Sequence, residues 1–219
     1  MPDRALALRQ LAGQHWPGAE SFFEGATPHL SAPQSVGFRA LYASVPRRLG
    51  ALAQRSVEPP AELAPWTRPH WNLTDYVRAA LVASAFATQP DEWQAAAHLH
   101  LFEAGEIGEQ VSLLRTLPLL PEPVRFLETG LQACRTNARS VFEAMVCENP
   151  FVAEHFPPLN FNQAVLKAVF IEVSARRIEG LDARITPELQ RMAAGYKSER
   201  LAAGRAVPVD IAYLIQYGA

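Results

Sequence analysis

Polar side chains are set into the otherwise apolar segment 160–173, NFNQAVLKAVFIEV. On a helical wheel Asn160, Gln163, Lys167 and Ser174 follow one side, because positions three, four or seven apart share a helix face. Most of the remaining circumference is apolar, which predicts a helix buried among others. An unpartnered buried ammonium group is strongly unfavourable, so we expect a carboxylate or an anionic ligand near Lys167.

Three interpretations of Lys167 stay open at this point. The amine can reach solvent from a peripheral helix by extending its methylene stem. It can instead form a structural salt bridge, or it can contact a ligand. The periodicity of the segment is compatible with all three.

Other polar residues have simpler interpretations. Asn137 lies between two expected helices, where a capping role is usual. Glu148 lies near a helix C-terminus, where a carboxylate opposes the helix dipole, so we expect a cationic partner. Glu199 and Arg200 lie on a long helix with an expected charged, exposed face. The turn RIEGLDARI has one glycine, too few for a phosphate-binding backbone nest.

The histidines give no metal signature. His98 and His100 are two positions apart on an expected helix and point in different directions. We place His100 on the face of Trp93, Ala97 and Leu101, as a core histidine. The sequence has no HExxH, nucleophile elbow, dinucleotide fingerprint or P-loop. We therefore expect no metal and no cofactor.

Composition indicates a soluble globular protein. Of 219 residues, 49% are apolar and 19% charged, with a formal net charge of −2. Basic residues cluster no further than pairs, so we expect no nucleic-acid partner. The longest uncharged apolar run, 79–87, is about half of a bilayer span, and Asp3, Arg4 and Arg9 interrupt any signal peptide. We expect a cytoplasmic protein without membrane insertion. Its two cysteines are expected to be buried free thiols.

The apolar pattern is helical nearly throughout, and no stretch has the period of two that indicates a hairpin. Helices are expected to begin near residues 73, 90, 106, 123 and 138, and short connectors make neighbours antiparallel. The sequence therefore predicts an all-α fold. Antiparallel hairpins could form a short α-solenoid or a compact multi-helix bundle, and both arrangements stay open.

We expect one domain, 1–219, with a helical core at 72–219 and a less regular part at 1–70. Helices are expected near 3–13 and 35–55, the second interrupted by Pro46. The segment VEPPAELAPWTRPHW, with Trp66 and Trp71 as anchors, is expected to be an ordered strap. Asn160 and Thr186 are expected to cap later helices, and Pro208 to begin the last.

Six segments carry a family resemblance: LPLLPEPVRFL, ACRTN, VFEAMVCENPF, HFPPLNFNQAVLKAVF, RIEGLDARITPEL and SERLAAGRAVPVDIA. In order and spacing they resemble the EboA family, from about residue 101 to 215. The resemblance implies an all-helical cytoplasmic protein from a bacterial operon for a secondary metabolite. That operon also encodes a prenyltransferase-like membrane protein and sugar-phosphate-type or hydrolase-type enzymes, and the family is linked to making or moving a small-molecule precursor.

The resemblance carries over motif positions but no catalytic roles. The candidate ligand-binding residues are Arg135, Asn137, Glu143, Glu148, Asn149, Asn162, Gln163, Lys167, Asp182, Arg184, Glu199 and Arg200. Many members carry tryptophan where Phe161 stands and histidine where Ser198 stands. Serine cannot replace a histidine acid or base, which disfavours catalysis through this position.

The leading hypothesis is an accessory, non-catalytic protein that holds a small polar or anionic metabolite in a helix-lined cleft. Its cations would be Lys167, Arg135 and Arg200, and its orienting amides Asn162 and Gln163.

Two alternatives belong to other functional classes. The first is an enzyme acting on a phosphorylated sugar or cyclitol-like metabolite, with Glu143, Glu148 or Glu199 as acid or base. The second is an interaction scaffold for other proteins of the same operon, which would present an exposed apolar surface.

Overall fold

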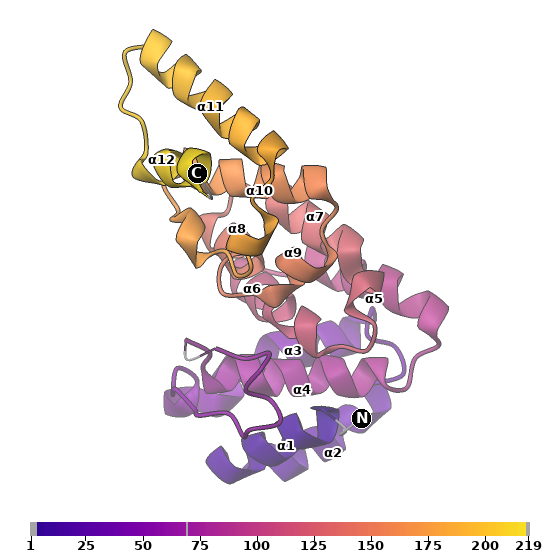
Figure 1. Ribbon diagram of the computed structural model, residues 1–219. Coiled ribbons are helices and arrows are strands. Elements are labelled where there is room, and N and C mark those ends of the chain that lie inside the picture. Colours follow the sequence, from indigo (N-terminus) through magenta and orange to yellow (C-terminus); the bar gives the residue numbers. More distant parts are fainter. Residues whose placement is uncertain (1–3, 69, 218–219) are drawn as a thin grey trace. The chain divides into compact units, whose positions relative to one another are not determined.

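The computed structural model describes residues 4–68 and 70–217 (Figure 1). Within these ranges the regular elements are twelve α-helices and six short 3-10 helices, and no strand occurs. Extended pairing is limited there to isolated bridges, Ser56 with Asn72 and Cys147 with Ile178. The predicted all-α fold is confirmed.

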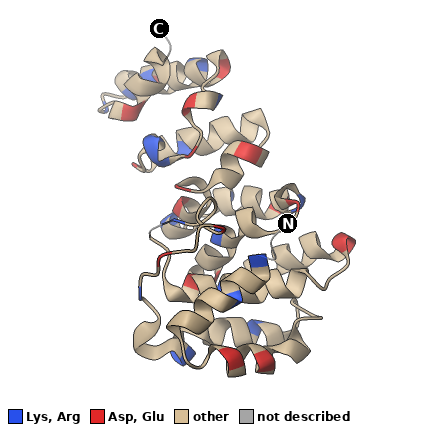
Figure 2. Ribbon diagram, turned by 60° about the horizontal axis from the view of Figure 1, so that its bottom comes forward, with Lys and Arg blue, Asp and Glu red and all other residues tan. Residues whose placement is uncertain are grey.

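The chain divides into two compact units, Met1–Met145 and Val146–Ala219. The expected single domain stays a prediction. In both units acidic and basic residues are interspersed along the helices (Figure 2).

The first unit contains most of the helices. They are α1 (Arg4–His15), α2 (Ala19–Ala26), α3 (Val36–Leu49), α4 (Leu73–Phe86), α5 (Asp91–Ala104), α6 (Ile107–Thr116), α7 (Leu127–Arg135) and α8 (Arg139–Val146), whose last residue belongs to the second unit. The 3-10 helices are η1 (Thr27–His29), η2 (Gly50–Leu52), η3 (Leu117–Leu119) and η4 (Pro123–Phe126). Elements begin at, or one residue after, the five starts expected from the apolar periodicity.

Helix α4 forms the centre of the first unit. Asn72 and Asp75 form a capping box at its start. Every residue from Leu73 to Phe86 is buried, and the helix packs against α1, α3 and α6. Because α4 has neighbours around its circumference, it is buried on all sides.

Two local predictions in the first unit are wrong. Helix α3 continues through Pro46 and ends only at Gly50, which has a φ of 55°. Pro46 has no N–H to bond to the carbonyl of Tyr42, and Nε of Arg78 donates to this carbonyl at 3.3 Å. On α5 the core histidine is His98, whereas His100 is exposed. His98 packs against the Phe86 and Phe126 rings at 5.9 and 4.9 Å, so contacts with neighbouring elements set the rotation of α5.

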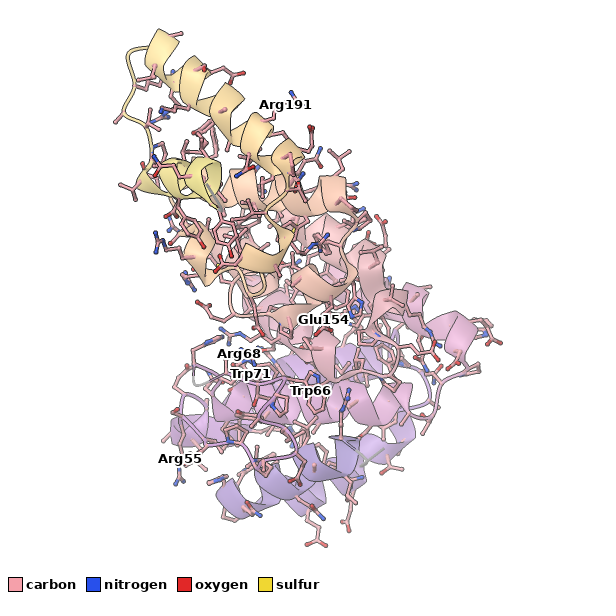
Figure 3. All side chains as sticks on the ribbon, in the orientation of Figure 1. Arg55, Trp66, Arg68, Trp71, Glu154 and Arg191 are labelled. Carbon is pink, nitrogen blue, oxygen red and sulfur yellow. The ribbon has the colours of Figure 1, made fainter. Side chains whose placement is uncertain are left out.

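Residues 53–68 and 70–71 belong to the irregular connection that leads to α4. Trp71 is only 3% exposed, and its ring centroid lies 5.3 Å from that of Tyr76 on α4. The guanidinium carbon of Arg4 lies 3.9 Å from the Trp66 ring centroid. Figure 3 labels Trp66 and Trp71. Both tryptophans therefore contact helices of the first unit.

The second unit contains α9 (Pro150–His155), α10 (Pro158–Phe170), α11 (Pro187–Ala202) and α12 (Val209–Gln216), with η5 (Ala175–Arg177) and η6 (Asp182–Arg184) between α10 and α11. Thr186 caps α11 as predicted, by accepting a hydrogen bond from the Leu189 N–H. The predicted cap at Asn160 is wrong, because α10 begins two residues earlier at Pro158, whose fixed φ suits the first position of a helix.

Helix α10 is also less buried than predicted. Gln163 and Ser174 are exposed, and Asn160 and Lys167 are partly exposed. The polar stripe therefore lies toward solvent. Leu159 and Phe170 are exposed as well, so this helix buries one face and is not enclosed by others.

Candidate functional site

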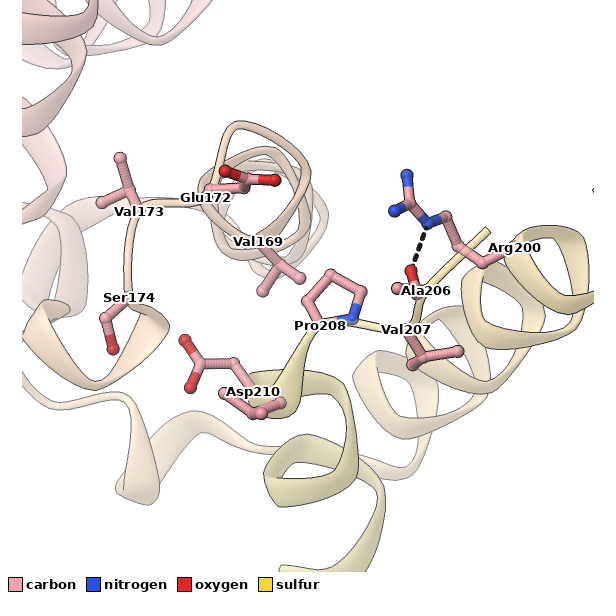
Figure 4. Close-up of a pocket in the computed structure, with 10 residues that line it drawn as sticks. Val169, Glu172, Val173, Ser174, Arg200, Ala206, Val207, Pro208 and Asp210 are labelled. Atoms are coloured by element: carbon pink, nitrogen blue, oxygen red, sulfur yellow. Dashed lines mark hydrogen bonds between the residues drawn. The ribbon is translucent and has the colours of Figure 1, made fainter. Parts of the chain in front are cut away.

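A cavity of about 340 Å³ lies where α10 ends and α12 begins, and we call it the Arg200 cavity (Figure 4). Most of its wall is apolar, from valines and a proline, and a few polar side chains interrupt it. The lining residues are Val169, Glu172, Val173, Ser174, Arg200, Ala206, Val207, Pro208, Val209 and Asp210. All of them belong to the second unit.

Two helices meet the cavity with the same C-terminal turn. At the end of α10 the N–H of Val173 bonds to the carbonyl of Ala168 at 2.8 Å, and the N–H of Glu172 to that of Val169 at 3.2 Å. These two bonds define a Schellman motif, with Glu172 at its left-handed position and a φ of 59°. This turn brings Glu172 to the cavity wall.

Helix α11 ends in the same motif and brings Arg200 to the cavity. The N–H of Arg205 bonds to the Arg200 carbonyl at 2.9 Å, the N–H of Gly204 bonds to that of Leu201 at 3.0 Å, and Gly204 has a φ of 63°. The chain then turns back, and Nε of Arg200 donates to the carbonyl of Ala206 at 2.9 Å. The guanidinium carbon also lies 5.9 Å from the Tyr196 ring centroid.

These contacts orient the guanidinium of Arg200 without using its terminal nitrogens. Within the described residues, neither Nη atom of Arg200 forms a hydrogen bond or an ion pair with the protein. A guanidinium presents its N–H groups in a planar fork that fits a carboxylate or a phosphate. Arg200 therefore has the donors to bind an anionic group.

Asp210 stands at the start of α12 and connects it to η5. Its Oδ2 accepts a hydrogen bond from the N–H of Ala175 at 2.7 Å. The carboxylate points toward Ser174 (Figure 4). One oxygen therefore fixes the wall of the cavity, and the other has no protein partner in the described part of the chain.

Three sequence candidates belong to the first unit and lie outside the Arg200 cavity. Arg135 is exposed, with a nitrogen 3.8 Å from a carboxylate oxygen of Glu128, and Asn137 is exposed. Glu143 accepts a hydrogen bond from Nε of Arg139 at 2.7 Å. Neighbouring residues thus contact both charged candidates.

Two candidates in the second unit have clear local roles. Glu148 forms a double hydrogen bond with Arg177, at 2.8 and 3.0 Å. This arginine is the cationic partner that the position of Glu148 predicted. Asn149 is buried and caps α9, since its Oδ1 accepts from the Phe151 N–H at 3.1 Å.

The two candidate amides of α10 have different surroundings. Nδ2 of the buried Asn162 lies 3.9 Å from the Met192 sulfur, and Gln163 is exposed. Lys167 is partly exposed, and neither it nor the amides line the Arg200 cavity. A shared cleft for these side chains stays a prediction.

The remaining candidates are divided between η6 and α11. Asp182 accepts a hydrogen bond from the Tyr213 hydroxyl, and Arg184 donates to backbone carbonyls of α9 and its C-terminus. Glu199 is exposed. Of the twelve candidates Arg200 alone lines the cavity.

Sequence reasoning missed Glu172, Ser174 and Asp210 as lining residues. Glu172 belongs to the segment 160–173 with the polar stripe, but it lies beyond the end of the helix. Asp210 belongs to the motif that also contains Arg200, SERLAAGRAVPVDIA. A carboxylate in the first turn of a helix, two residues after Pro208, is a signal that could have identified it.

The first unit has a buried polar cluster that links α3, α4 and α6. Asp75 accepts from Oγ of Ser112 at 2.8 Å and from Nη1 of Arg115 at 2.5 Å. Arg78 donates to the carbonyls of Tyr42 and Gly108, at 3.3 and 2.8 Å. Because protein groups occupy these donors and acceptors, the cluster holds the helices together.

Two further findings concern the described ranges only. No group of three or more His, Cys, Asp and Glu side chains has an arrangement that could hold a metal ion. None of the helices there combines the length and apolar character needed to cross a bilayer.

Comparison with protein families gives a match over most of the chain. The model of the family described as metabolite traffic protein EboA matches residues 29–216. No curated protein and no solved structure has a significant similarity to the chain.

Proposed function

The chain belongs to the EboA family, and on that premise we propose that it binds a small anionic metabolite in the Arg200 cavity and releases it without chemical change. The family is described by metabolite traffic, which requires reversible binding and not chemistry. An accessory role in bacterial secondary-metabolite biosynthesis or precursor transport, in the cytoplasm, forms part of the proposal. So does contact with other proteins of the same operon.

The observation that carries the proposal is the oriented guanidinium of Arg200. Its Nε is held by the Ala206 carbonyl at 2.9 Å, and its Nη donors are left for a ligand. Preorganised donors bind an anion without first giving up protein partners. Apolar walls from Val169, Val207 and Pro208 lower the local dielectric, which strengthens the charge-assisted bonds.

The enzymatic alternative receives less support from the geometry. It requires two carboxylates in one cleft, in the roles given to Glu143, Glu148 or Glu199. Glu143 and Glu148 bind neighbouring arginines, Glu199 is exposed, and none of the three lines the Arg200 cavity. Two other carboxylates, Glu172 and Asp210, line the cavity, and no histidine, cysteine or lysine stands beside them in the lining.

The test uses 3-phenylpropionate, an apolar carboxylate, as the probe. Titration of the full-length protein, followed by NMR chemical shifts, should give saturable changes at the residues of the cavity. Arg200→Gln should weaken binding by roughly tenfold to a hundredfold, the usual value of hydrogen bonds to a charged group. The matched control is Arg205→Gln, which removes an exposed arginine that does not line the cavity. Equal affinities for wild type and Arg200→Gln would refute the proposal.

A further inference from the structure

We infer that α11 and α12 form a hinged hairpin that carries one wall of the Arg200 cavity and is held in place by a polar latch. We call residues 187–216 the hairpin. Its movement would change the width of the cavity, and a ligand that contacts both walls would hold it closed. This consequence for ligand binding rests on the proposed function, whereas the hinge and the latch can be tested without a ligand.

The first observation is that the two walls of the cavity come from different segments. Residues 169 and 172–174 belong to the end of α10 and the turn that follows it, whereas Arg200 and residues 206–210 belong to the hairpin. In Figure 4 the side chain of Val169 points toward Pro208 on the opposite wall. Displacement of the hairpin would therefore separate the two walls.

The second observation is that the hairpin is held together by its own contacts. Among the helices described in the second unit, α11 and α12 form the most closely packed pair. Near the start of α11, Nε2 of Gln190 donates to the carbonyls of Ile215 and Tyr217 at 3.3 and 3.0 Å. Near its end, Nε of Arg200 donates to the carbonyl of Ala206 at 2.9 Å. Because bonds close the hairpin near both ends, it can move as one body.

The third observation is how little of the hairpin is buried. Leu189 and Ala193 are the buried residues among the sixteen of α11, and Ile211 and Leu214 are those among the eight of α12. Every residue from 194 to 206 is at least partly exposed. Segments with few buried apolar side chains open at a lower free energy than the core does. Since both buried residues of α11 lie in its first half, the hinge lies near the start of this helix.

The contact between α11 and α10 is also imperfect. Tyr196 of α11 packs its ring against the largely exposed ring of Phe170, with the centroids 6.4 Å apart. The Tyr196 hydroxyl is buried, and no described residue forms a hydrogen bond with it. A buried hydroxyl without a partner destabilises the arrangement that buries it. Movement of the hairpin would let water reach this hydroxyl, which lowers the cost of the movement.

Two residues on one face of α12 form the latch. Oδ2 of Asp210 accepts a hydrogen bond from the N–H of Ala175 in η5 at 2.7 Å. Three residues later, the Tyr213 hydroxyl donates to Asp182 in η6, and the guanidinium carbon of Arg176 lies 4.3 Å from the Tyr213 ring centroid. Such hydrogen bonds exchange with bonds to water at a small net cost. The latch therefore holds the hairpin against η5 and η6 and still lets it open.

Amide hydrogen exchange of the full-length protein without ligand tests the latch. Tyr213→Phe removes one hydroxyl and keeps the ring, and it should raise the exchange rates of the α12 amides by roughly tenfold, the usual value of a hydrogen bond to a charged group. Asp182→Ala should have the same effect, and the double variant should add little, because both substitutions remove one bond. Tyr217→Phe is the matched control, since no described residue forms a hydrogen bond with its hydroxyl.

The same measurements include the outcomes that overturn the inference. Equal α12 exchange rates in Tyr213→Phe and Tyr217→Phe would show that the bond to Asp182 is not a latch. In Tyr213→Phe the amides in the second half of α11 should accelerate together with those of α12, because the hairpin moves as one body. Acceleration confined to α12 would show that this helix moves alone, and the hinged hairpin would be wrong.

A second experiment adds 3-phenylpropionate and separates the inference from the proposed function. At about ten times its dissociation constant, a ligand that binds only the closed cavity should slow the exchange of the wild-type hairpin by about tenfold. Binding detected by NMR without this protection overturns the inference and leaves the proposed function intact. Absence of binding, together with faster exchange in Tyr213→Phe, contradicts the proposed function and leaves the hinged hairpin supported.

Discussion

The guanidinium carbon of Arg184 lies 4.1 Å from the centroid of the Phe161 ring. From this position its terminal nitrogens donate to the carbonyls of Val152, Ala153 and Phe156 at 3.0, 2.9 and 2.8 Å. Carbonyls at the end of a helix have no partner within the helix. Arg184 thus supplies donors to the C-terminal end of α9 while it stacks on a ring of α10.

Arg184→Met should therefore lower the stability of the protein. The substitution keeps much of the methylene stem but removes the donors and the cation–π contact. We expect the free energy of unfolding to fall by about 2–4 kcal/mol, from several hydrogen bonds to a charged group. Urea denaturation followed by circular dichroism measures it. The control Arg135→Met removes an exposed arginine that lies 3.8 Å from its carboxylate partner, and it should change the free energy of unfolding little. An equal loss of stability in both variants would contradict the structural role of Arg184.

Gly180→Ala should destabilise the turn before η6 more than Gly204→Ala destabilises the end of α11. Both glycines have positive φ, 71° and 63°, so both substitutions introduce a similar strain of about 1 kcal/mol. A Cβ at Gly180 would also lie 2.7 Å from the Cβ of Ala153, whereas nothing lies within 4 Å of one at Gly204. The difference between the two variants in thermal unfolding measures this contact. If Gly204→Ala is the less stable variant, the packing at Gly180 is wrongly described.

His98 should make the first unit sensitive to acid. Burial among aromatic rings lowers its pKa from the ordinary value of 6.5 to about 3. Between these values the unfolded chain binds a proton that the folded chain does not. Stability is therefore complete above pH 6.5 and falls as the pH is lowered below it, by up to about 1.4 kcal/mol per pH unit.

The variant His98→Gln isolates this effect, because glutamine cannot take up a proton in this range. Denaturation of both proteins at pH 7, 6, 5 and 4 measures their free energies of unfolding. The two values should approach each other as the pH falls, because the wild type loses more stability. The acidic residues are common to both proteins, and their contribution cancels in the difference. A constant difference across the series would mean that His98 does not titrate as its burial requires.

Helix positions were predictable from the sequence because burial repeats with the helical period. The starts of α4, α5, α6 and α8 follow from apolar spacing, prolines and capping residues. The rotation of a helix about its axis is harder to predict from the sequence. On α5 both His98 and His100 have apolar neighbours in sequence, and only the Phe86 and Phe126 rings decide that His98 is the buried one.

The cavity was not predictable for a related reason. The polar stripe on α10 predicted a ligand contact for Lys167 and Gln163, yet α10 contributes to the cavity through its C-terminal end. Arg200 and Asp210 come from segments about thirty to forty residues later in the chain. Helical periodicity describes neighbours on one helix, and proximity between the end of one helix and the start of another depends on tertiary packing.

Loss of Asp75 should destabilise the first unit. It is 3% exposed and accepts hydrogen bonds from Ser112, from Arg115 and from the N–H of Asn72. Asp75→Ala would leave the Arg115 guanidinium in a partly buried site without its carboxylate, which typically costs about 3–5 kcal/mol. Asp75→Asn retains hydrogen-bonding capacity and removes only the charge, so its loss of stability should be smaller.

Chemical denaturation should give the order of stability wild type, then Asp75→Asn, then Asp75→Ala. The control Glu188→Ala removes an exposed ion pair with Arg191, and it should leave the denaturation midpoint nearly unchanged. If Asp75→Ala were as stable as this control, the cluster would not hold α4 and α6 together.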